Sequence, residues 1–142
     1  MSEIFYVENT NMGVGTSTPG TLLQLEGTEP YLTLKNSTDE ITDGGCESKI
    51  IFEDHSDTTI AQIQGSHDGT ANDTKGDLIF STHDGSNLVT ALTISSAGIL
   101  NIPATTASSS TTTGALTIAG GVGLAGDLIV GDDLKLLSDS AI

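Results

Sequence analysis

The chain has 142 residues and a formal net charge of −15, because 19 acidic residues stand against four lysines and no arginine. With no fork-shaped guanidinium group and no possible basic surface, we expect neither nucleic acid nor an anionic membrane as a partner. The single cysteine excludes a disulfide framework, and no apolar run is long enough to insert into a membrane.

The composition and the order of the segments predict an all-β protein. The opening sequence MSEIFYVENT lacks the basic and apolar parts of a secretory signal, so we expect synthesis in the cytoplasm. We divide the chain into an N-terminal segment (1–20), a domain of β-strands and turns (21–103), a Ser/Thr-rich linker (104–113) and a hexad-repeat β-helical segment (114–142).

Short runs of alternating apolar and polar residues predict strands in the second part of the chain. Turns are expected where Asp68-Gly69 and Asp84-Gly85 supply the positive φ of tight connections. No stretch of ten or more residues has a helical period. The predicted strands cover residues 31–35, 49–53, 59–63, 77–81 and 91–94.

The linker reads ATTASSSTTT and follows Pro103. None of its side chains can fill a hydrophobic core, so we expect a flexible connection or an extended strand that lies on another chain.

A six-residue repeat begins at Leu116. The chain can be cut into the hexads LTIAGG, VGLAGD, LIVGDD and LKLLSD. Positions one and three are apolar and point to the same side of a strand, whereas positions five and six are small or acidic and suit a turn. A six-residue period is typical of β-helical winding.

Four hexads cannot bury their apolar side within one chain, because repeat folds need neighbours to cover that side. We therefore expect three copies to wind around one axis as an intertwined homotrimer, with positions one and three forming an apolar seam. The predicted trimer seam consists of Leu116, Ile118, Val122, Leu124, Leu128, Val130, Leu134 and Leu136.

The same segment contains a literal G-x-G-x-x-G at residues 121–126, the fingerprint of dinucleotide-binding domains. That fingerprint needs a helix after the glycines and then a second parallel strand. Here Asp127–Gly131 predicts another strand and turn, and too few residues follow for the rest of the unit. We expect no cofactor, because the glycines belong to the repeat.

Three segments resemble known viral proteins. Gly13-Val14-Gly15-Thr16-Ser17-Thr18-Pro19, followed by Leu22–Gly27, resembles the G-(I/V)-G-T-x-x-P…L-x-V-x-G segment of phage and large-virus fibre proteins. Residues 76–102 are similar to the strand pair that commonly follows in those fibres. Residues 105–131 resemble a glycine-rich repeat of fibre, tail and minor structural proteins of phages and algal viruses.

The resemblance implies an elongated, trimeric, β-rich component of the virion that projects outward and contacts the host. Its partners would be other virion proteins and a host-surface glycan or receptor, and its location the virion after synthesis in the host cytoplasm. Two other functions stay open. One is a cement protein that decorates the capsid, and the other is a tailspike-like enzyme that degrades glycans.

Residues that could support chemistry are few. His55, His67 and His83 each lie in an Asp-containing turn, where one histidine per chain could build a three-histidine metal site on a threefold axis, although exposed turn histidines are the simpler interpretation. Residues 72–77 resemble an oxygen-rich calcium loop but lack its bidentate acid. Paired carboxylates are adjacent in sequence and so do not converge as a glycosidase requires. We therefore expect no metal site, no catalytic residue and no enzymatic activity.

Overall fold

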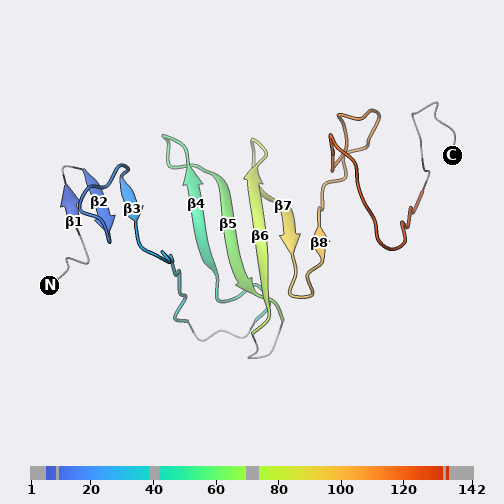
Figure 1. Cartoon of the computed structure of the whole chain (residues 1–142). Helices are drawn as coiled ribbons and strands as arrows, with labels where there is room; N and C mark the ends of the chain where they lie inside the picture. Colours follow the sequence, from blue (N-terminus) through green and yellow to red (C-terminus); the bar gives the residue numbers. More distant parts are fainter. Residues whose placement is uncertain (1–5, 9, 39–41, 70–73, 133, 135–142) are drawn as a thin grey trace.

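The computed structural model describes residues 6–8, 10–38, 42–69, 74–132 and 134. In this part of the chain the protein is all-β, with strands in two sheets and neither a helix nor a barrel, which confirms the all-β part of the predicted fold. Figure 1 shows the strands side by side in chain order, with no second layer over either sheet. No described strand of one sheet contacts a strand of the other.

The smaller sheet has the order β1-β2-β3, formed by Tyr6–Glu8, Asn11–Val14 and Leu23–Leu25. β1 and β2 are antiparallel, whereas β2 and β3 are parallel. The connection between the parallel strands is held by Asn11 Nδ2, which donates to the carbonyl oxygen of Pro19 at 3.0 Å. The expected division of the chain after residue 20 thus falls between two strands that pair with each other.

Two glycines allow the backbone to pass close to itself in this sheet. Gly15 has φ +82°, and a β-carbon at this position would overlap the carbonyl oxygen of Glu26. A β-carbon on Gly13 would overlap the carbonyl oxygen of Thr16. The Glu26 N–H donates to the Val14 carbonyl at 2.9 Å and so extends the parallel pairing. The G-V-G-T motif therefore has a steric explanation, because no side chain fits at either glycine.

The larger sheet is an antiparallel meander of five strands that follow one another in the sequence. Each hairpin connects neighbours, so the sheet forms from local pairings. Its strands are β4 (Ser48–Glu53), β5 (Thr59–His67), β6 (Gly76–His83), β7 (Leu88–Ile94) and β8 (Leu100–Asn101).

Four of the five predicted strands are confirmed as parts of β4, β5, β6 and β7. The prediction of a strand at residues 31–35 is wrong, since this segment is exposed and irregular. Its alternating pattern suits a strand, but a strand needs a partner for its backbone groups, and no described segment lies beside it as one.

An aspartate closes the tight hairpin between β6 and β7. Between β6 and β7, Asp84 Oδ1 accepts hydrogen bonds from the N–H groups of Ser86 (2.7 Å) and Asn87 (2.8 Å). The N–H groups of Asn87 and Ser86 hold the pKa of Asp84 below its ordinary value of 3.8. Gly69 and Gly85 have φ of 129° and 100°, which confirms the positive φ predicted for the Asp-Gly turns.

The strand register gives the larger sheet two unlike faces, because residues paired across antiparallel strands project on the same side. We call one side the apolar face. The three rows that carry its apolar side chains are Phe52–Ala61–Thr82–Val89, Ile50–Ile63–Phe80–Leu92 and Ser48–Gly65–Leu78–Ile94–Leu100, and a fourth row, His67–Gly76, lies at its end. The other side, the polar face, has among its rows Lys49–Gln64–Ile79–Thr93–Asn101 and Ile51–Gln62–Ser81–Thr90.

Burial in this sheet is the reverse of that in an ordinary globular domain. Its strands bury no apolar side chain, and their buried side chains are Gln64, Ser66 and Ser81, all of the polar face. On the apolar face Ile50, Phe52 and Leu100 are exposed. The hydrophobic core that normally stabilises a sheet is therefore missing from the described part of the single chain.

Candidate self-association surface

The predicted trimer seam lies on the exposed surface of the described chain. Its exposed fraction runs from 43% at Val130 to 63% at Val122 and Leu128. Leu136 lies outside the described residues. The exposed seam residues are Leu116, Ile118, Val122, Leu124, Leu128, Val130 and Leu134.

The backbone of the C-terminal segment bends once in each of the first three hexads. The bends lie at residues 119–120, 125–126 and 131–132, which are positions four and five of successive hexads. Between the bends there is no strand, and no backbone hydrogen bond joins residues 115–132 to another described residue. The six-residue period is therefore present in the backbone, while residues 115–132 of the single chain do not form the hydrogen-bonded ladder of a β-helix.

The hexad glycines have no steric role within one chain. Gly120, Gly121, Gly123, Gly126 and Gly131 all lack positive φ, and a β-carbon on any of them would meet no atom within 4 Å. The bends therefore do not use the left-handed conformation for which glycine is usually needed.

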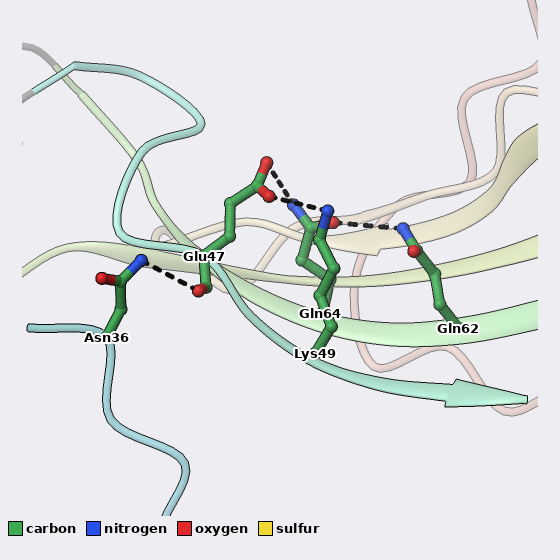
Figure 2. Close-up of polar contacts among 5 residues, drawn as sticks. All are labelled: Asn36, Glu47, Lys49, Gln62 and Gln64. Carbon is green, nitrogen blue, oxygen red and sulfur yellow. Dashed lines mark hydrogen bonds and ion pairs between the residues drawn. The ribbon is translucent and has the colours of Figure 1, made fainter. Parts of the chain in front are cut away.

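The polar face satisfies its own hydrogen-bonding groups, as Figure 2 shows. Gln62 Nε2 donates to Gln64 Oε1 at 3.1 Å, and Gln64 Nε2 donates to Glu47 Oε1 at 3.5 Å. Glu47 Oε2 lies 2.7 Å from Lys49 Nζ. Asn36 Nδ2 donates to the Glu47 carbonyl at 3.1 Å and ties the preceding segment to β4. This face can remain against water without a partner.

Two carboxylates meet at the end of the larger sheet near the loop after β5. Ser96 connects them, since its hydroxyl donates to Asp68 Oδ2 and its N–H donates to Asp77 Oδ1 at 3.2 Å. The Ser96 hydroxyl lowers the pKa of Asp68, whereas burial and then the charge of Asp68 raise the pKa of Asp77. A proton shared by the pair therefore resides on Asp77.

Asp77→Asn is expected to stabilise the protein at pH 7. A raised pKa means that the folded state binds the proton more tightly than the unfolded state, so ionised Asp77 lowers stability at neutral pH. Asparagine keeps the acceptor for the Ser96 N–H and removes the charge. Thermal melting should show a higher melting temperature for the variant at pH 7. The difference should shrink as the pH falls through the raised pKa of Asp77 towards the ordinary value of 3.8.

Asp68→Asn is the matched control and should have the opposite effect. Because the pKa of Asp68 is lowered, its ionised form stabilises the fold above the ordinary value, and that contribution is lost as the pH falls below it. If both variants melt at the same temperature at pH 7, the assignment of the proton to Asp77 is wrong.

The three histidines lie apart in the single chain. His55 contacts Ser56 in the β4–β5 turn, His67 Nδ1 lies 3.3 Å from the Thr42 carbonyl, and His83 Nδ1 accepts from the Gly85 N–H at 3.0 Å. Among the described residues, no group of three or more His, Cys, Asp or Glu side chains is placed to hold a metal ion. The suggested calcium loop at 72–77 lies partly outside the described residues. No helix of the described chain could span a membrane.

The chain matches no protein-family model, and no curated protein matches it in sequence.

The apolar face of the larger sheet is a second apolar surface, which the sequence of any single strand does not reveal. A comparison of every second residue across neighbouring strands could have revealed this face, because Ile63, Phe80 and Leu92 lie on the same side of the sheet as Ile50. The described chain thus carries two exposed apolar surfaces, the seam and this face.

Proposed function

We propose that the protein is a structural component of a virion, a homotrimeric fibre or spike that projects from the particle and contributes to host attachment. The observation that carries the proposal is the agreement between the hexads and the backbone. Three bends occur six residues apart, and the described apolar positions of the hexads lie exposed beside them.

Three copies of the segment would supply what one copy lacks. Extended backbone with unpaired N–H and C=O groups and exposed apolar side chains is completed when other strands lie alongside it. Glycines at and beside the bends would let the neighbouring backbones approach closely, which gives these residues the role they lack in the single chain.

The remaining features suit a fibre better than a compact enzyme or a nucleic-acid-binding domain. The sheets form single layers laid out along the chain, and the charge of −15 keeps such a surface soluble. Assignment to a virion rests on the G-V-G-T and glycine-rich motifs and their resemblance to fibre proteins. A host-surface glycan or receptor and other virion proteins are the partners that this function requires.

The oligomeric state is the first test of this proposal. Sedimentation equilibrium at micromolar concentration should give three times the 14.5 kDa mass of one chain, and sedimentation velocity should indicate an elongated particle. A folded monomer at that concentration would overturn the proposal. Saturable binding to empty capsids by a compact particle would favour a cement protein instead, and release of reducing sugars from host glycans would favour an enzyme.

A further inference from the structure

We propose that the apolar face of the larger sheet is a second self-association surface, which packs against the same face of the other copies. This inference rests on the proposed homotrimer and names a surface outside the C-terminal seam. Its basis is the register of β4 to β8, which collects ten apolar side chains on one side of a single-layered sheet.

The distribution of burial shows that this face is incomplete in one chain. On the polar face Gln62 pairs with Gln64, and Gln64 pairs with Glu47; this face also contains the buried side chains of the sheet. The apolar face has no described element over it, as Figure 1 shows. Exposed apolar area of this extent on a soluble protein marks a surface that a partner covers.

Charge favours a second copy of the same chain as that partner. The three rows of the apolar face contain no Asp, Glu or Lys, although the chain carries a net charge of −15. Two copies that met through acidic surfaces would bring like charges together, which opposes association. Across this face two copies can meet without that repulsion, and each supplies the apolar area that the other needs.

The size of the face sets how much of a shared interface the sheet can supply. Five strands about 4.8 Å apart, with about six residues each at about 3.3 Å per residue, cover roughly 500 Å². A stable interface needs about 800 Å² per partner. The sheet face alone falls short of that value, so the exposed seam residues that follow β8 would have to supply the remainder.

Three such sheets fit around one axis. Sheets about 24 Å wide that form the sides of a triangular prism have their centres about 7 Å from the axis, which is about 2 Å more than half of the usual 10 Å between packed sheets and leaves room for large side chains. Side chains such as Ile63 and Phe80, in the central strands, would then fill the interior of the prism. The polar faces would form its outer surface, where their hydrogen-bond network contacts water.

Neighbouring isoleucines in β4 provide a matched test. Ile50 belongs to the apolar face and is 43% exposed in one chain, whereas Ile51 belongs to the polar face and is 50% exposed. Ile50→Asp should weaken self-association by about 100-fold or more, measured by sedimentation equilibrium of the full chain, because it places a carboxylate in the shared interior. Ile51→Asp, the same change one residue away, should leave the mass unchanged.

A second variant guards against simple misfolding of β4. Leu100→Asp lies on β8, at the opposite end of the same face, and should also dissociate the assembly while circular dichroism still shows β structure. If the wild type is a trimer and Ile50→Asp behaves like Ile51→Asp, this inference is wrong and the trimer stands. If Ile50→Asp lowers the melting temperature but keeps the trimer mass, the face is covered within the chain and the inference is again wrong. A monomeric wild type would overturn both proposals.

Discussion

Leu128→Asp is expected to prevent trimerisation of the C-terminal segment. Leu128 occupies position one of the third hexad and is exposed in the single chain. In a β-helical trimer this substitution forces three carboxylates into an apolar interior, which should make the free energy of assembly less favourable by several kcal/mol. Thermal melting of the full chain should show a lower melting temperature, and limited proteolysis should show faster cleavage within residues 114–142.

Ile129→Asp is the control, because it removes a similar aliphatic group and adds the same charge one residue further on. Ile129 occupies position two and is 91% exposed, compared with 63% for Leu128. On the outer side of the winding the change should cost no more than about 1 kcal/mol. If the two variants melt alike, or if Ile129→Asp is the less stable, the six-residue register is wrong.

Gly15→Ala should disrupt the parallel pairing of β2 with β3. The added methyl group would overlap the Glu26 carbonyl oxygen, and the φ of +82° is itself unfavourable for alanine. Together these effects should cost about 3 kcal/mol or more. Amide hydrogen exchange should show that residues 11–25 lose protection, while the larger sheet keeps its own.

Two other glycines separate the steric overlap from the backbone strain. Gly44 has a similar φ of +78° but open space around its β-carbon position, so Gly44→Ala should cost only the left-handed strain of about 1–2 kcal/mol. Gly27 has neither feature, and Gly27→Ala should have almost no effect. A cost for Gly15→Ala no larger than that for Gly44→Ala would show that the Glu26 carbonyl does not require a glycine.

The larger sheet was predictable because each of its main strands alternates apolar and polar residues, and because the turn residues at the strand ends act on their close neighbours in sequence. Asp84, for example, closes its hairpin through neighbours two and three positions away. β1, β2, β3 and β8 were missed because each is four residues long or fewer. The parallel pairing of β2 depends on Gly15 approaching Glu26, a contact between distant residues that periodicity does not report.

The candidate surfaces were predictable only in part. The hexads predict a register for the seam, but its contacts would lie between chains, and in the described part of one chain Leu128 is 63% exposed. The sequence did not reveal the apolar face because Ile50, Ile51 and Phe52 are consecutive apolar residues, so β4 places apolar side chains on both sides of the sheet. Only the pairing of Ile51 with Gln62 and of Ile50 with Ile63 assigns each residue to a side.

The outermost strands of the larger sheet limit how far the protein can assemble. Among the described residues β4 pairs on one side alone, and its end is interrupted by a bulge between Phe52 and Glu53, while β8 has two residues. A twisted, charged border and a very short border both resist the addition of further strands, which is the route to aggregated fibrils. Growth in the plane of the sheet is therefore blocked, and association through the faces can close into a particle of finite size.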